Sequence, residues 1–135
     1  MTLTGQESAR QGLLDTSVFI AKETGRALGE LPDPAAVSVV TLAELHLRVL
    51  MAHGSAVRAR RLRTLTMVQN TFEPLPIDSE VARTFAELVA EAERHGTRPK
   101  IMNTWTAATA GAQDIPVYTQ DEGFAEIAKV RIHRV

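Results

Sequence analysis

Three acidic residues that are far apart in the sequence each lie close to the end of a segment that predicts a short buried strand. Asp15 directly follows one such segment, Asp121 follows another, and Glu44 lies in the first turn of a helix predicted after a third. Carboxylates that crowd together repel one another, and they persist in one place only when a cation neutralises them. Oxygen ligands of this kind suit Mg²⁺ or Mn²⁺. A metal held there could activate water and offset the charge that develops on a phosphodiester during in-line attack.

Each of these acids also has a purely structural interpretation. Asp15 can cap the helix that follows it, and Asp121 can cap a short helix near the end of the sequence. The segment Thr41-Leu-Ala-Glu44 fits a capping box as well as it fits a metal site. Spacing alone leaves both interpretations open, so the predicted fold must indicate whether the three acids converge.

Strands and helices alternate along the predicted fold. Short apolar or β-branched segments predict strands at residues 12–15, 36–40, 115–118 and 130–135. Apolar periodicity and capping residues predict helices at 17–31 (loosened near Gly25 and Gly29), 41–53, 55–71, 79–95, 102–112 and 122–129. This alternation predicts an α/β fold of three layers, with helices on both faces of a central, mainly parallel sheet. Ligands of such folds bind outside the carboxyl ends of the strands, which is where the three acids lie.

Length, composition and charge exclude several classes of protein. A chain of 135 residues is of ordinary size for one domain, and we expect 1–135 to form one, with 1–11 as a flexible N-terminal extension. There is no cysteine, which excludes a disulfide scaffold, a thiolate zinc site and a cysteine nucleophile. No apolar run approaches the roughly 20 residues of a membrane span, and 1–11 lacks the pattern of a signal peptide, so we expect a cytoplasmic protein. The formal net charge is −1, so any nucleic-acid-binding surface must be local.

Five segments resemble, in order and roughly in spacing, the motifs of PIN-domain ribonucleases of the VapC toxin type, which belong to type II toxin–antitoxin systems. They are 13–20 (LLDTSVFI), 38–45 (SVVTLAEL), 76–80 (PIDSE), 104–110 (TWTAATA) and 118–121 (YTQD) with Phe124. No single motif is specific, so the resemblance depends on the ordered set, which runs from about Leu13 to Val135. It implies a PIN-like fold and metal-dependent hydrolysis of RNA, with Mg²⁺ or Mn²⁺ as the cofactor.

The resemblance also implies roles for individual residues. By it, the metal ligands are Asp15, Glu44 and Asp121, Thr119 supports the site, and Asn103 stands at the family's fourth acidic position, as a weak ligand. An amide oxygen can ligate a hard cation, but it brings no charge and cannot serve as a base. Three explanations fit this departure: natural variation with activity retained, a weakened or inactive nuclease, or an Asp-to-Asn change introduced so that a toxic protein could be produced. The resemblance further implies a homodimer and a cognate antitoxin whose tail covers the acidic cleft.

Two groups of basic residues could bind RNA phosphates. Arg58 and Arg61 belong to an arginine-rich stretch of the helix predicted at 55–71, and Arg98 and Lys100 shortly precede Asn103. Cations near a nuclease site would contribute salt-dependent affinity for RNA. The alternative is that they form solvated helix faces. The single tryptophan, one turn from Asn103, could stack on a base, but its large apolar ring favours core packing.

Two other acid-rich α/β classes are disfavoured. A haloacid-dehalogenase-like phosphatase needs a second aspartate two residues after the first, where this chain has Ser17. A phospho-receiver domain needs paired acids after its first strand and a lysine at the end of a late strand, and neither can be placed here. The remaining rival is a PIN-like domain that binds RNA or an antitoxin without cutting, and its support is Asn103.

Overall fold

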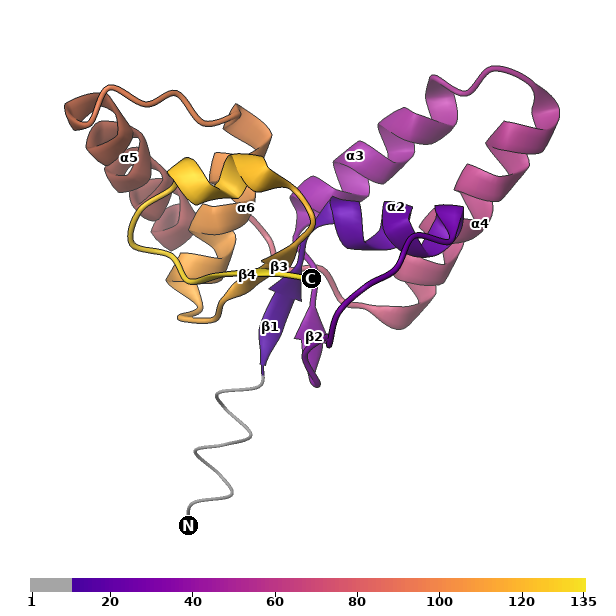
Figure 1. Ribbon diagram of the computed structural model, residues 1–135, viewed down its shortest axis with the longest axis horizontal. Helices are drawn as coiled ribbons and strands as arrows, with labels where there is room; N and C mark the ends of the chain where they lie inside the picture. Colours follow the sequence, from indigo (N-terminus) through magenta and orange to yellow (C-terminus); the bar gives the residue numbers. More distant parts are fainter. Residues whose placement is uncertain (1–10) are drawn as a thin grey trace, which may run out of the picture.

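A four-stranded parallel sheet forms the centre of the computed structural model, which describes residues 11–135 (Figure 1). The strands are β1 (Gly12–Leu14), β2 (Ala35–Ala36), β3 (Val117–Thr119) and β4 (Ile132–Arg134), in the order β2-β1-β3-β4. The sequence prediction of a parallel sheet is therefore confirmed. The predicted N-terminal extension lies, except for Gln11, outside the described residues.

Helices cover both faces of this sheet, which confirms the predicted three-layer α/β fold. Figure 1 shows α2, α3 and α4 on one side and α5, α6 and the short η1 on the other. Their bounds are α2 Thr16–Thr24, α3 Val39–Leu50, α4 Ser55–Thr71, α5 Ser79–Arg94, α6 Ile101–Ala112 and η1 Glu122–Glu126. None of the helices within 11–135 is long and apolar enough to cross a membrane.

Two apolar cores hold the layers together because successive residues of a strand point to opposite faces of the sheet. Leu13 and Val117, paired across β1 and β3, pack against α5 and α6 and are fully buried. Leu14 and Tyr118, the next pair, face the core that contains Val18 of α2. The buried strands and helices fix the positions at which β1 and β3 end, and the acidic residues follow those ends.

The helix predicted at 17–31 is shorter in the structure. It ends at Thr24, because Gly25 adopts a left-handed conformation with φ of 76° and its N–H donates to the carbonyls of Ala21 and Lys22. Glycine takes this conformation without the steric penalty of a side chain, and it commonly ends helices in this way. The glycine therefore terminates the helix, whereas the sequence pattern predicted only that it would loosen it.

The second predicted strand is also shorter, and its last residues belong to the next helix. Ser38 caps α3 by accepting a hydrogen bond from the N–H of Thr41 (3.4 Å), so the helix begins at Val39 and the prediction of a helix opening at Thr41 was wrong. Glu44 consequently lies in the second turn. The capping-box interpretation of Glu44 is wrong for the same reason, since Thr41 is inside the helix.

The last helix and the last strand are also shorter than the sequence predicts. The helix predicted at 122–129 is a 3₁₀ helix that ends at Glu126, and β4 begins at Ile132. The helices predicted at 55–71, 79–95 and 102–112 agree with α4, α5 and α6 to within one residue at each end.

Candidate active site

Asp15 joins the end of β1 to the start of α2. Its Oδ2 atom accepts the N–H of Ser17 (3.3 Å), which caps the helix, and also the hydroxyl of Thr119 (2.9 Å). The side chain is buried, and this burial raises the pKa of Asp15 although the bonds from Ser17 and Thr119 act in the opposite direction. Asp15 is thus a helix cap whose carboxylate is also bonded to Thr119 of the neighbouring strand.

Thr119, fully buried at the end of β3, connects two of the acids. Its hydroxyl donates to Asp15 and accepts the backbone N–H of Asp121 (2.9 Å). The hydroxyl of Ser17 lies 3.1 Å from that of Thr119 and accepts the N–H of Gln120 (2.9 Å). These bonds fix the loop after β3 against the start of α2, so they set the distance between Asp15 and Asp121.

Glu44 reaches the same region from α3. Its Oε1 atom accepts the hydroxyl of Thr16 at 2.5 Å, and Thr16 also bonds to Thr41 of α3 (3.1 Å). Burial raises the pKa of Glu44, and the negative charges of Asp15 and Asp121 raise it further. The three predicted acids therefore share one electrostatic environment, and their charges repel one another.

Asp121 and Asn103 are in direct contact. Asn103 is buried in the first turn of α6, and its amide Nδ2 donates to Oδ2 of Asp121 (3.2 Å). The other carboxylate oxygen of Asp121, Oδ1, accepts the N–H of Gly123 (2.8 Å). The Gly123 bond is the main reason that the pKa of Asp121 is lowered, with smaller contributions from Asn103, Lys100 and Arg134. A Cβ atom at Gly123 would lie only 3.1 Å from Nδ2 of Asn103 and from Oδ1 of Asp121. Asp121 is therefore also a helix cap, and the glycine permits the close approach of Asn103.

We call Asp15, Glu44, Asp121 and Asn103 the acidic site. As they lie, no three carboxylate or imidazole groups within 11–135 form a cluster that could hold a metal ion. None of the three acids forms an ion pair with a lysine, arginine or histidine of this part of the chain. The donors are all hard oxygens, two of the three acids have raised pKa values, and their charges repel. This donor chemistry fits a hard divalent cation. The hydrogen bond from Thr16 occupies one oxygen of Glu44, and those from Asn103 and Gly123 occupy the two oxygens of Asp121.

The basic residues predicted to bind RNA have two different locations. Lys100 immediately precedes α6; its charge contributes to the lowered pKa of Asp121 and opposes the burial and repulsion that raise the pKa of Glu44. Arg98 is exposed two residues earlier. Arg58 and Arg61 do not reach the acidic site; they donate to the backbone carbonyls of Ala52 (3.5 Å) and Arg48 (2.7 Å) in the α3–α4 hairpin. The single tryptophan stacks on Phe85 with ring centroids 3.7 Å apart, so its core role is confirmed.

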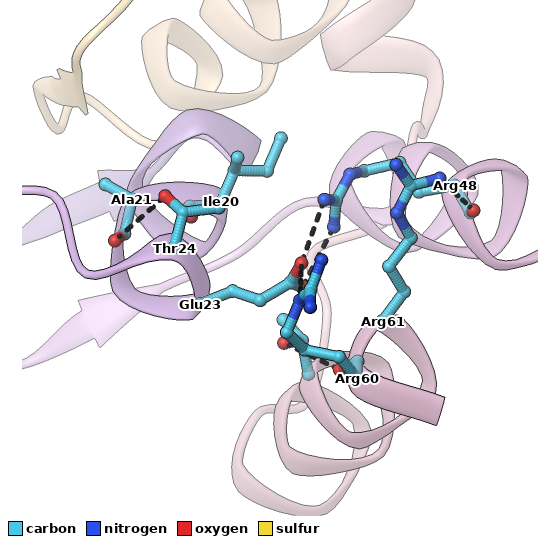
Figure 2. Close-up of polar contacts among 8 residues, drawn as sticks. Ile20, Ala21, Glu23, Thr24, Arg48, Arg60 and Arg61 are labelled. Atoms are coloured by element: carbon cyan, nitrogen blue, oxygen red, sulfur yellow. Dashed lines mark hydrogen bonds and ion pairs between the residues drawn. The ribbon is translucent and has the colours of Figure 1, made fainter. Parts of the chain in front are cut away.

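A second charged cluster, which the sequence did not predict, joins α2 to this hairpin (Figure 2). Glu23, whose side chain is only 2% exposed, accepts two hydrogen bonds from Arg48 (both 3.1 Å) and one from Thr64 (2.8 Å), and it lies 3.5 Å from Arg60. The Arg48 bonds are the largest reason that the pKa of Glu23 is lowered. We call these four residues the Glu23 network. No short-range sequence pattern predicts this network, because Arg48 lies 25 positions after Glu23 and Thr64 lies 41 positions after it.

Comparison with known proteins agrees with the fold. The family model described as PIN domain matches residues 12–130. The chain belongs to the PIN domain family, whose ribonucleases generally depend on a divalent metal.

Within this family the chain is similar to VapC proteins of Mycobacterium tuberculosis. It is 47% identical over 129 residues to Ribonuclease VapC5, covering 92% of this chain and 95% of the relative, and 43% identical over 130 residues to Ribonuclease VapC4, covering 93% and 97%. The crystal structure of VapBC-5 from the same organism, a member of the VapBC family of toxin–antitoxin systems, contains a chain of similar fold. The match has a TM-score of 0.86 and 44% identity, and it covers 93% of this chain and 99% of that one.

Proposed function

We propose that this chain is a divalent-metal-dependent endoribonuclease that acts as the toxin of a toxin–antitoxin pair, with Mg²⁺ or Mn²⁺ as its ion. One observation carries the proposal: Asp15, Glu44 and Asp121 come from three separate segments, the charges of Asp15 and Asp121 act on Glu44, and none of the three forms an ion pair within residues 11–135. The relatives named as ribonucleases support this assignment.

Each residue of the acidic site has a distinct proposed role. Asp15, Glu44 and Asp121 would hold the ion through carboxylate oxygens, and Asn103 would contribute at most an uncharged oxygen. When bound, the ion would supply an activated water and offset the charge that develops on the phosphodiester as its P–O bond breaks. Thr119 positions Asp15 and Asp121 through its hydroxyl.

The alternative is a domain that binds RNA or an antitoxin without cutting. The hydrogen bond from Asn103 to Asp121 favours it, because an amide that donates to a neighbouring carboxylate neutralises part of the repulsion that a cation would otherwise relieve. A carboxylate at position 103 would restore that repulsion and add a charged ligand.

Cleavage of total RNA in Mg²⁺, in Mn²⁺ and in EDTA separates the two functions. The parent chain is compared with Asn103→Asp, with Asp15→Ala and with Asp114→Asn, a control that removes an exposed carboxylate paired with Arg131 outside the acidic site. We expect cleavage that EDTA and Asp15→Ala abolish and that Asp114→Asn leaves unchanged. We also expect Asn103→Asp to bind the metal about tenfold more tightly, seen as a larger metal-dependent rise in unfolding temperature.

Two other outcomes have clear meanings. If only Asn103→Asp cuts, the site is correct and this chain is a disabled nuclease. If no variant cuts any RNA, the binding alternative replaces the proposal.

The proposal includes a cognate antitoxin whose tail covers the acidic site, a homodimer, and a cytoplasmic location. The similarity to a chain of VapBC-5 supports the antitoxin. Exposed apolar side chains on the α3–α4 hairpin offer surface for a partner chain; they include Leu47, Leu50 (76% exposed), Leu62 and Met67, and Met51 follows α3.

A further inference from the structure

Arg134, near the C-terminus, lies beside the acidic site because its strand, β4, pairs with β3. It is the last residue of β4 and pairs in register with Thr119, the residue that positions Asp15 and Asp121. Alternation along the strand puts Arg134 on the sheet face of Ile132, which is the face of α6 and η1. Its positive charge contributes to the lowered pKa of Asp121, which agrees with this placement.

The protein itself makes little use of the Arg134 guanidinium. Its one ion pair within 11–135 is with Glu122, at 3.9 Å, and the side chains are 52% and 86% exposed. An exposed pair at this distance contributes little to stability. A phosphate can accept two N–H groups of a guanidinium through two of its oxygens. It could therefore replace Glu122 as the partner of Arg134 with little loss of stability.

Lys100 approaches the same acids from a different element. It is exposed at the start of α6, three residues before Asn103, and no ion pair of Lys100 occurs in the described part of the chain. Two exposed cations, one at the end of β4 and one just before α6, thus act on the carboxylate of Asp121. A metal bound to the carboxylates would interact with one phosphate of an RNA. The neighbouring phosphates each carry a negative charge of their own and would need other cations.

We propose that Arg134 and Lys100 form a clamp on the RNA backbone, in which each binds a phosphate adjoining the one that is cut at the acidic site. This inference rests on the proposed function, because it assigns the substrate contacts of the same site. Both contacts are with phosphate, so they position the RNA without reading its sequence.

Salt-dependent RNA binding tests the clamp. The probe is a fluorescein-labelled single-stranded RNA of mixed sequence, bound to the full chain in EDTA and measured by anisotropy over a series of salt concentrations. We expect Arg134→Gln and Lys100→Gln each to weaken binding several-fold and to reduce the slope of log affinity against log salt by about 0.7, the value for one phosphate contact on a single strand. A residue with a purely structural role would not change this slope.

Two matched variants control for charge and for competition. Arg131→Gln removes an exposed arginine just before β4 whose partner is Asp114, and we expect it to keep the parent slope. Glu122→Gln removes the acid that competes for Arg134, and we expect slightly tighter RNA binding. Where the parent chain cuts RNA, KM should rise in both clamp variants and stay unchanged in Arg131→Gln.

The outcomes separate this inference from the proposed function. Parent-like slopes in both clamp variants, or no salt-dependent RNA binding by the parent, overturn the clamp even if the parent cuts RNA. Reduced slopes in both clamp variants, with no cleavage by any chain in Mg²⁺ or Mn²⁺, support RNA binding by Arg134 and Lys100 and contradict the nuclease.

Discussion

Two regions of this molecule bury carboxylates, and they do so with opposite electrostatic results. In the Glu23 network, arginines surround the carboxylate and the pKa of Glu23 is lowered. In the acidic site, burial raises the pKa values of Asp15 and Glu44, and no arginine or lysine of the described residues forms an ion pair with them. The negative charge of Glu23 is balanced by arginines of the chain, whereas the charges of Asp15 and Glu44 are not balanced by any ion pair among the described residues.

From this difference we interpret the Glu23 network as structural, and we propose that the acidic site is functional. The Glu23 network ties α2 to the α3–α4 hairpin, and bidentate contact with Arg48 gives it a defined geometry (Figure 2). The acidic site stores repulsion that folding does not relieve, a feature that natural proteins retain chiefly where a ligand relieves it. Neutral amide substitutions should therefore have opposite effects in the two regions.

The largest expected effect is that of Asp15→Asn on catalysis. An asparagine can still accept the bonds from Ser17 and Thr119 through its oxygen, so the helix cap is kept while the proposed metal ligand is lost. We expect cleavage to fall by at least roughly a hundredfold, more than for loss of a group that only supports a ligand. The assay uses whichever background cuts RNA, the parent or Asn103→Asp.

The same variant should unfold, without metal, at the parent temperature or above it, since a buried charge has been removed. Its unfolding temperature should no longer rise with Mg²⁺ or Mn²⁺. A metal-dependent rise equal to that of the parent would show that Asp15 is not a ligand.

Glu23→Gln should have the next largest effect, and it should act on stability. The substitution leaves Arg48 and Arg60 without a carboxylate partner. Because both arginines keep contact with water, we expect a loss of about 1–2 kcal/mol, below the range for fully buried pairs. Thermal unfolding would then move down by roughly 4–8 °C.

Glu91→Gln is the matched control for this change. Glu91 is also paired, with Arg94, His95 and Lys129, but on the surface of α5, so its loss should leave the unfolding temperature close to that of the parent. Equal destabilisation by both variants would contradict the distinction between the Glu23 network and an ordinary surface pair.

Much of the fold and the convergence of the three acids could be predicted from the sequence. Alternating strands and helices imply a parallel sheet, and a parallel sheet brings the residues after β1 and β3 to one edge. The errors lay at element ends: a glycine stopped α2 early, and Ser38 started α3 two residues before the predicted position. These depend on capping hydrogen bonds and on the conformation of one residue, which periodicity does not detect.

The missed features depend on contacts between distant segments. Nothing near Glu23 in the sequence identifies Arg48 or Thr64 as its partners, and the arginine-rich stretch of α4 resembled a surface that binds RNA. Arg134 was missed because its proximity to Asp121 depends on the register of β4 against β3. The contact between Asn103 and Asp121, in contrast, follows from two motifs that the sequence already places at one site.

The smallest expected effect, and the most specific, is a difference in how the two regions respond to acid. The free energies of unfolding of the parent, Asp15→Asn and Glu23→Gln are compared across acidic and neutral pH in EDTA. The Asp15 carboxyl has a folded-state pKa above its ordinary value of 3.8, so the folded chain binds the extra proton and ionisation destabilises the fold as pH rises. The advantage of Asp15→Asn over the parent should thus be greatest at neutral pH and shrink as pH falls through the raised pKa.

Glu23 has the opposite sign because its folded-state pKa lies below the ordinary 4.5. Its ionised form stabilises the fold, and this contribution is complete above 4.5 and is lost as pH falls through the lowered pKa. The advantage of the parent over Glu23→Gln should therefore persist to a lower pH than the Asp15 difference does. Denaturant titration at each pH measures both differences, because the linear dependence of unfolding free energy on denaturant concentration gives the stability of each variant. Two differences of the same sign would mean that the two regions do not bury their carboxylates in opposite ways.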